Sequence, residues 1–77
     1  MLGRNIVGPR VREARLAQRP RLTQRTLAAK LQLAGLDLDR AEVSKIESKI
    51  RRVYDYEVVA LASALGVSAG WLLGTES

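Results

Sequence analysis

Apolar residues recur along this chain at the three- and four-residue spacing that places side chains on one face of a helix. Four predicted helix starts share one local pattern, in which a residue with a side-chain oxygen lies between two apolar residues, one directly before it and one four after it. The apolar pair closes over the first helical turn, while the oxygen accepts a free N–H group. The four expected capping residues are Thr23, Asp39, Asp55 and Ser68.

The apolar pairs that flank these caps are Leu22 with Leu27, Leu38 with Val43, Tyr54 with Val59, and Val67 with Leu72. Glu42 stands three residues after Asp39, which adds the arrangement of a capping box. The first helix is marked differently, because Gly8 is a permissive cap and Pro9 suits the first helical position.

Glycine or proline marks the expected helix ends. Gly35, Gly66 and Gly74 each follow a helical pattern, where glycine adopts the left-handed conformation easily. Pro20 ends the first helix, because the residue before a proline avoids the helical region. The sequence therefore predicts an all-α fold with helices at residues 9–18, 23–34, 39–48, 55–65 and 69–73. The apolar faces of these helices predict a core of Val11, Ala14, Leu27, Ala28, Leu31, Val43, Ile46, Val58, Leu61, Ala62, Leu65, Val67, Trp71 and Leu72.

Length and composition limit the chemistry that this chain can perform. Its 77 residues suffice for one domain, residues 1–77, with a folded part at about 6–74. The chain has no Cys and no His, so it lacks a thiol nucleophile, the usual general base and the commonest metal ligand. It also has no phosphate-binding loop and no dinucleotide fingerprint. We therefore expect that the protein is not an enzyme and has no metal, cofactor or small-molecule ligand.

The sequence also gives an expectation about location. Residues 1–7 are too short and too interrupted by polar residues for the apolar run of a signal peptide. No window approaches the roughly 20 apolar residues of a membrane span. We expect a cytoplasmic protein without a membrane partner.

Charge is distributed unevenly along the chain. Residues 1–54 hold all 13 basic residues and five of the eight acidic ones, which gives this part a net charge of +8. Residues 55–77 hold the other three acids and no base, which gives −3. Such asymmetry favours a polyanion on one side of the molecule, with a solvated basic surface as the alternative.

Several short motifs, taken in their order and spacing, resemble a known family. They are Leu22-Thr23-Gln24, Leu27-Ala28, Val43-Ser44-Lys45-Ile46-Glu47, Leu61-Ala62, Ala64-Leu65-Gly66-Val67-Ser68 and Trp71-Leu72-Leu73-Gly74. Over residues 6–74 the chain resembles the phage-repressor and Cro-like helix-turn-helix family, also called the xenobiotic-response-element (XRE) family. The resemblance implies a compact five-helix lambda-repressor-like domain whose second and third helices bind double-stranded DNA. It further implies a transcriptional regulator of the repressor type, associated with the nucleoid when bound to DNA.

The resemblance also assigns roles to individual residues. The helix at about 39–48 matches the recognition helix, and the residues that it offers for base readout are Arg40, Ala41, Ser44 and Lys45. Gln24 matches a family residue that contacts a phosphate. With it, the helix start and the basic run after the recognition helix give the expected phosphate contacts Thr23, Gln24, Arg25, Lys49, Arg51 and Arg52. Arg15 and Glu47 match a pair that forms a salt bridge between the first and third helices.

Three features depart from the family pattern. The stretch from Leu27 to Val43 is about five residues longer, which we interpret as a second helix that reaches Ala34 and a turn at 35–38, with a longer loop as the alternative. Lys49 stands where many family members have glycine after the recognition helix, so either this lysine is left-handed or the helix continues. Two extra residues around Pro20 lengthen the first turn.

Two other functions remain open at this point. A protein-interaction module, such as an antitoxin or adaptor subunit, would use the same fold with an acidic partner on the basic face. An RNA or non-specific DNA binder is less favoured, because the chain has few aromatic residues for base stacking. The sequence leaves the oligomeric state open, with residues 67–74 as the candidate surface for a homodimer.

Overall fold

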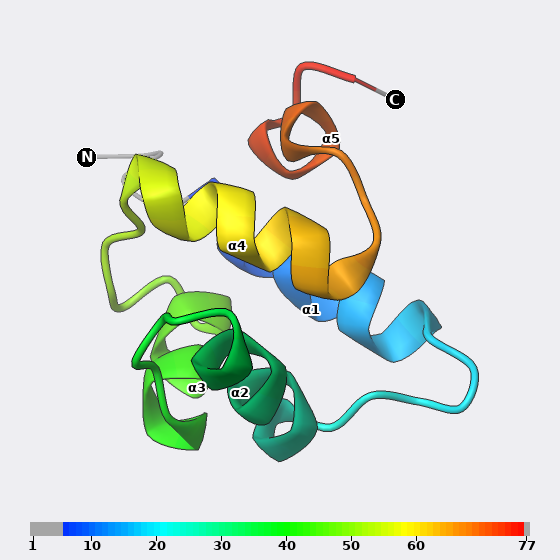
Figure 1. The fold of residues 1–77 in the computed structure, drawn as a ribbon. Helices are drawn as coiled ribbons and strands as arrows, with labels where there is room; N and C mark the ends of the chain where they lie inside the picture. The colour runs from blue at the N-terminus through cyan, green and yellow to red at the C-terminus, as the bar shows by residue number, and fades with distance from the viewer. Residues whose placement is uncertain (1–5, 77) are drawn as a thin grey trace.

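The computed structural model describes residues 6–76, so the first five residues of the stretch considered as a signal peptide lie outside it. In this range the chain forms five α-helices and no strand. The helices are α1 Gly8–Ala17, α2 Gln24–Leu33, α3 Arg40–Glu47, α4 Asp55–Leu65 and α5 Ala69–Leu73. The α2 and α3 helices lie together at one end of the molecule and α5 lies at the other, with α1 and α4 between them (Figure 1). None of the helices is both long and apolar enough to cross a membrane in the part of the chain that is described.

Three of the four predicted caps are confirmed by hydrogen bonds. Thr23 Oγ1 accepts the N–H of Thr26 at 3.0 Å, and Asp39 Oδ1 accepts the N–H of Glu42 at 2.9 Å. The Ser68 Oγ accepts from the third residue of α5 in the same way, at 3.0 Å. The leucines before the first two of these caps, Leu22 and Leu38, are buried, as the pattern requires.

The fourth cap is displaced by one residue from the prediction. Tyr54, not Asp55, precedes the helix, and Asp55 is the first residue of α4. The reason is Glu57, whose carboxylate accepts the Tyr54 N–H at 3.0 Å and thereby closes the first turn. With this start, Val53 and Val58 pack on the core, while Tyr54 and Val59 are 50 % and 64 % exposed.

The connection between α2 and α3 begins one residue earlier than predicted. The α2 helix ends at Leu33, and Gly35 then has a φ of +91°, a conformation that costs glycine nothing. The N–H of Leu36 donates to the Leu31 carbonyl at 2.9 Å, which closes the helix end. The residues that make the stretch from Leu27 to Val43 longer than in the family are thus divided between α2 and a short ordered connection to α3.

The end of α3 resolves the question raised by Lys49. The helix stops at Glu47, and Lys49 has a φ of +66°. Left-handed backbone costs a residue with a Cβ about 1 kcal/mol. The turn is held by two backbone bonds, from the Lys49 N–H to the Ile46 carbonyl at 3.1 Å and from the Ile50 N–H to the Lys45 carbonyl at 3.0 Å. The predicted left-handed ends at Gly66 and Gly74 are also present.

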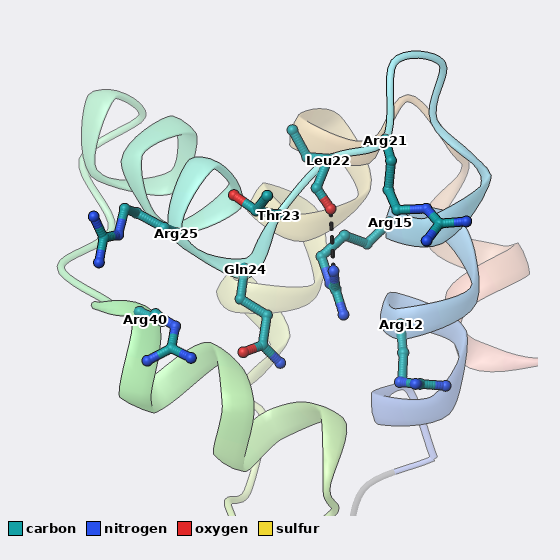
Figure 2. Close-up of a pocket in the computed structure, with 8 residues that line it drawn as sticks. All are labelled: Arg12, Arg15, Arg21, Leu22, Thr23, Gln24, Arg25 and Arg40. Atoms are coloured by element: carbon teal, nitrogen blue, oxygen red, sulfur yellow. Dashed lines mark hydrogen bonds between the residues drawn. The ribbon is translucent and has the colours of Figure 1, made fainter.

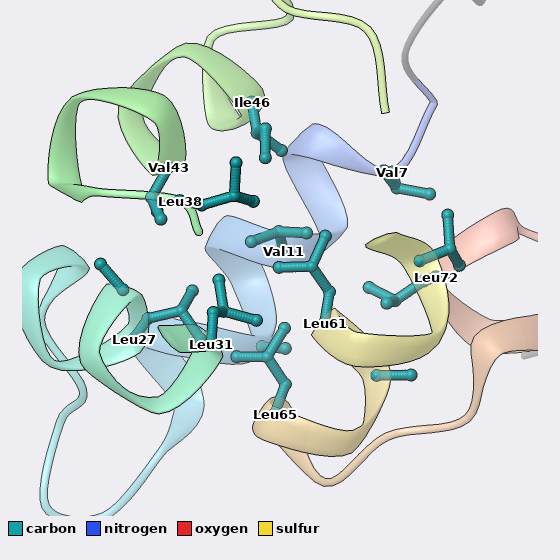
Figure 3. Close-up of a cluster of buried hydrophobic side chains, with 14 of the residues drawn as sticks. Val7, Val11, Leu27, Leu31, Leu38, Val43, Ile46, Leu61, Leu65 and Leu72 are labelled. Atoms are coloured by element: carbon teal, nitrogen blue, oxygen red, sulfur yellow. The ribbon is translucent and has the colours of Figure 1, made fainter. Parts of the chain in front are cut away.

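The core is aliphatic and draws on all five helices (Figure 3). Every predicted core residue is buried except Val67 and Trp71, which are partly buried against the cluster. Val7, Leu22 and Leu38 join the buried cluster although they precede helices rather than lie on their faces. At the edge of the core, the Arg10 guanidinium lies 4.7 Å from the centre of the Trp71 ring and donates to the Trp71 carbonyl at 2.9 Å.

A charged network joins α3 to α4 through the turn between them. Arg51 Nε donates to Glu42 on α3 at 2.7 Å. The two terminal nitrogens of the same guanidinium donate to Glu57 on α4, at 2.8 and 2.9 Å. The Glu57 side chain is only 3 % exposed, so this is a buried, two-point contact. It fixes the start of α4 and the turn that leaves α3.

This network predicts an acid-sensitive part of the stability. The hydrogen bonds from Arg51 lower the pKa of Glu57 against the opposing effect of burial, and they raise the pKa of Arg51. A carboxyl whose pKa is lowered by folding stabilises the fold fully above its unfolded-state pKa of about 4.3, and this contribution disappears as the pH falls through the folded-state pKa. We expect Glu57→Gln to lower the free energy of unfolding by about 2 kcal/mol at pH 7.

The measurement is urea denaturation between pH 7 and pH 2.5. The difference in the free energy of unfolding between the native protein and Glu57→Gln should shrink in the acid range. Glu13→Gln is the control, because Glu13 is an exposed residue of α1, and this substitution should have little effect at pH 7. A difference that stays constant down to pH 2.5 would contradict the assignment of this carboxylate.

Candidate nucleic-acid interface

The α3 helix has one buried and one exposed face. Val43 and Ile46 are completely buried on the core side. Arg40, Ala41 and Lys45 are exposed on the opposite side, and Ser44 is intermediate. The four residues expected to read bases thus lie on the solvent-facing side of this helix, where Ser44 is the one that is partly buried.

An open hollow of about 720 Å³ lies beside the start of α3. Its walls come from α1, from the connection between α1 and α2, from the first turn of α2 and from the first residue of α3 (Figure 2). Five of its lining side chains are arginines. The complete lining is Arg12, Arg15, Arg21, Leu22, Thr23, Gln24, Arg25 and Arg40.

Arg15, which lines the hollow, belongs to a buried ion pair. Arg15 donates to both carboxylate oxygens of Glu47, from Nε at 2.7 Å and from Nη2 at 3.0 Å. The Gln24 side chain donates to the same carboxylate at 3.0 Å. The side chains of Arg15 and Glu47 are 10 % and 3 % exposed. One carboxylate therefore ties α1, α2 and α3 together.

The hollow is strongly positive. Its described lining contains no acid, and among its arginines Arg15 is paired with Glu47. Arg12, Arg21, Arg25 and Arg40 are all exposed, and none of them forms an ion pair with another described residue. A concave surface lined by unneutralised charges of one sign concentrates its field on a ligand of the other sign.

The first turn of α2 adds to this field. The first N–H groups of a helix have no acceptor within the helix, and together they act as a partial positive charge. Of these N–H groups, the Thr23 side chain accepts only the one of Thr26. Gln24 and Arg25, the first two residues of α2, line the hollow together with the other arginines, which makes this end of α2 suited to a phosphate group.

The structure places the expected phosphate contacts in three different situations. Thr23, Gln24 and Arg25 line the hollow, although the side-chain amide of Gln24 is already bonded to Glu47. Lys49 and Arg52 are exposed beyond the end of α3. The Arg51 guanidinium is held by Glu42 and Glu57, so it acts as a link between helices rather than as an open cation.

Two lining residues were missed by the sequence reasoning. Arg12 lies one helical turn before Arg15 on α1, and this spacing was the available signal for a shared face. Arg21 directly precedes the buried Leu22, and nothing local in the sequence indicates where its side chain points. Both bring positive charge from the first helix and its connection to the hollow.

Comparison of the chain with protein-family models, with curated proteins and with solved structures gave no match. Within residues 6–76 no three His, Cys, Asp or Glu side chains are grouped so as to hold a metal ion. The function has to be proposed from the hollow, from the exposed face of α3 and from the charges around them.

The buried ion pair leads to a prediction about stability. Glu47→Ala removes the acceptor for Arg15 and Gln24 and leaves a guanidinium buried without a counter-charge. We expect the free energy of unfolding, measured by urea denaturation, to fall by about 3 kcal/mol or more.

Asp37→Ala serves as the control, because Asp37 is an exposed acid in the connection before α3. Its effect should stay within about 0.5 kcal/mol. A loss below about 1 kcal/mol for Glu47→Ala would show that the pair contributes no more than an exposed one.

Proposed function

We propose that this protein binds double-stranded DNA in a sequence-specific manner, with α3 in the major groove, and acts as a transcriptional regulator of the repressor type. In this proposal α2 and α3 are the two helices of a helix-turn-helix in a lambda-repressor-like domain. The observation that carries the proposal is the position of the four unneutralised arginines, which adjoin the N-terminal end of an exposed helical face.

The size of α3 suits the groove. An α-helix with its side chains is about 10–12 Å in diameter, which fits the major groove of about 12 Å. The buried side of α3 is anchored by Val43, Ile46 and Glu47, so the outward side can enter the groove without disturbing the core. A rigid helix positions its side chains more accurately than a loop.

The exposed side chains offer different kinds of base contact. Arg40, the first residue of α3, has the planar fork that matches O6 and N7 of guanine. Ala41 presents a methyl group to a thymine methyl, and Ser44 lies one turn from Arg40 on the same side. Lys45 is 3.6 Å from Glu42 but remains 54 % exposed, so it can extend to a base or to a phosphate.

Phosphate contacts flank α3 at both ends in this proposal. The hollow at the start of α2 receives one backbone strand through Thr23, Gln24 and Arg25, with Arg12 and Arg21 as the cations that line the same hollow. Lys49 and Arg52 serve the other end. Such contacts fix the register of α3 in the groove without reading sequence themselves.

Duplex binding at several salt concentrations tests the phosphate contacts. Neutralising about five phosphates predicts a slope of about −4 to −5 in the plot of log affinity against log salt. Arg25→Ala should weaken binding to every sequence alike and reduce the slope by about one. Lys30→Ala, which removes the same charge from the exposed end of α2, is the matched control. A protein without measurable duplex affinity at low salt would favour the protein-interaction module instead.

Selection from a random duplex library tests the readout. We expect the native protein to select a defined consensus sequence. Arg40→Ala should lose about 1–3 kcal/mol of binding free energy and relax the preference at one base pair. An unchanged consensus in Arg40→Ala would remove this residue from the base contacts and assign it to the phosphates.

A further inference from the structure

Most arginines that lack a partner within the protein gather at one place. Four of the nine arginines in residues 6–76 donate side-chain hydrogen bonds to oxygen atoms of the protein. The other five make no side-chain hydrogen bond or ion pair with another described residue. Four of these five line the hollow beside α3, namely Arg12, Arg21, Arg25 and Arg40, and the fifth is Arg52. The hollow thus collects guanidinium groups whose N–H donors are available to a ligand.

These four arginines approach the hollow from two sides. Arg25 and Arg40 lie on one side of Gln24 in Figure 2, and Arg12 and Arg21 lie on the other. The first pair comes from α2 and α3, and the second comes from α1 and the connection that follows it. The buried ion pair between α1 and α3 fixes the two sides relative to each other. The cations are therefore arranged before any ligand arrives, which reduces the cost of binding.

The size and charge of the hollow define the class of ligand that suits it. Its volume of about 720 Å³ lies within the range of small-molecule sites, roughly 300–1,000 Å³. Guanidinium groups bind phosphate oxygens through two parallel hydrogen bonds, which makes arginine the preferred partner of phosphate groups. One phosphate group reaches the cations of one side, whereas a chain of several phosphates reaches both sides.

We propose that the hollow binds a free oligophosphate, a linear chain of three or more phosphate groups, and that this ligand competes with the DNA duplex. The binding itself rests on the hollow, and only the competition rests on the proposed function. The sequence led us to expect no small-molecule ligand, because it has no phosphate-binding loop. Here arginines from separate elements take the place of such a loop, and packing brings them together.

Competition follows from the overlap between the two ligands. In the proposed complex a strand of the duplex contacts Thr23, Gln24 and Arg25, and these residues line the hollow. The duplex is stiff over this length, and α3 in the groove fixes the position of its strand. A short phosphate chain is free to enter the hollow and contact Arg12 and Arg25 together. Once bound, it neutralises the cations that the strand needs, so the site would regulate DNA binding by the supply of oligophosphate.

Calorimetric titration of the full chain with sodium triphosphate, without nucleic acid, tests the site. We expect one ligand for each chain and a dissociation constant on the order of 100 µM at low salt, because the contacts are charged but remain open to water. Inorganic monophosphate should bind at least about tenfold more weakly, since it reaches one side of the hollow. A chain that shows no saturable binding of triphosphate would overturn the proposal.

A matched pair of charge reversals tests the location. Arg12→Glu and Lys30→Glu change the net charge equally, and both positions are exposed on helices, but only Arg12 lines the hollow. Arg12→Glu should weaken triphosphate binding more than about tenfold, and Lys30→Glu less than about threefold, because screening by salt limits the effect of a distant charge. Circular dichroism verifies that both variants are folded. Equal weakening by the two variants would show attraction to the overall charge and would overturn the site.

ATP in place of sodium triphosphate identifies the source of the phosphate chain. Equal or weaker binding of ATP would assign the site to the phosphate chain, whereas tighter binding would add a base stacked on a guanidinium group. Either result supports the site, and the two distinguish an inorganic ligand from a nucleotide.

Fluorescence polarisation of a labelled duplex tests the competition at constant ionic strength. Triphosphate at ten times its dissociation constant should raise the apparent dissociation constant of the duplex about elevenfold, whereas sodium chloride of equal ionic strength should not. A duplex affinity that triphosphate leaves unchanged would overturn the competition. If the chain bound no duplex at all, the proposed function would fail, and the calorimetric titration would still decide whether the site exists.

Discussion

The ion pair between Arg15 and Glu47 is the contact on which the rest of the arrangement depends. It joins the last turn of α1 to the end of α3, and through Gln24 it also holds the first turn of α2. Burying two charges is unfavourable unless their geometry satisfies both, and here the guanidinium meets both carboxylate oxygens. The result is a fixed orientation of α3. The four other arginines that line the hollow form no ion pair with another described residue, so they act on a ligand with their full charge.

A second charged contact gives the opposite end of the molecule its register. Arg51 bridges Glu42 on α3 and Glu57 on α4, and the Glu57 carboxylate closes the first turn of α4. The α3 helix is therefore held by two carboxylates, one through α1 and one through the following turn. This clamping leaves its outer face free of contacts with the core.

Features of local origin were predictable from the sequence, and features set by distant partners were not. Thr23, Asp39 and Ser68 cap their helices as expected, because each capping oxygen and the N–H that donates to it lie only three residues apart. The cap of α4 was predicted one residue too late, because Glu57 closes the first turn at Tyr54 and Arg51 holds Glu57 in place. The local sequence does not indicate this contact, so Arg51 was expected to contact a phosphate. The Arg15–Glu47 pair was expected from the family resemblance alone, and the hollow formed with Arg12 and Arg21 required the packed structure.

The central claim is that α3, held by this ion pair, presents its outer face to a duplex. Nuclear magnetic resonance titration of the labelled protein with a selected duplex tests it residue by residue. The account predicts that the largest amide shifts fall on Arg40, Ala41, Ser44 and Lys45 and on the first turn of α2, with small shifts along α4 and α5. Largest shifts on α4 or α5, with α3 unchanged, would contradict it.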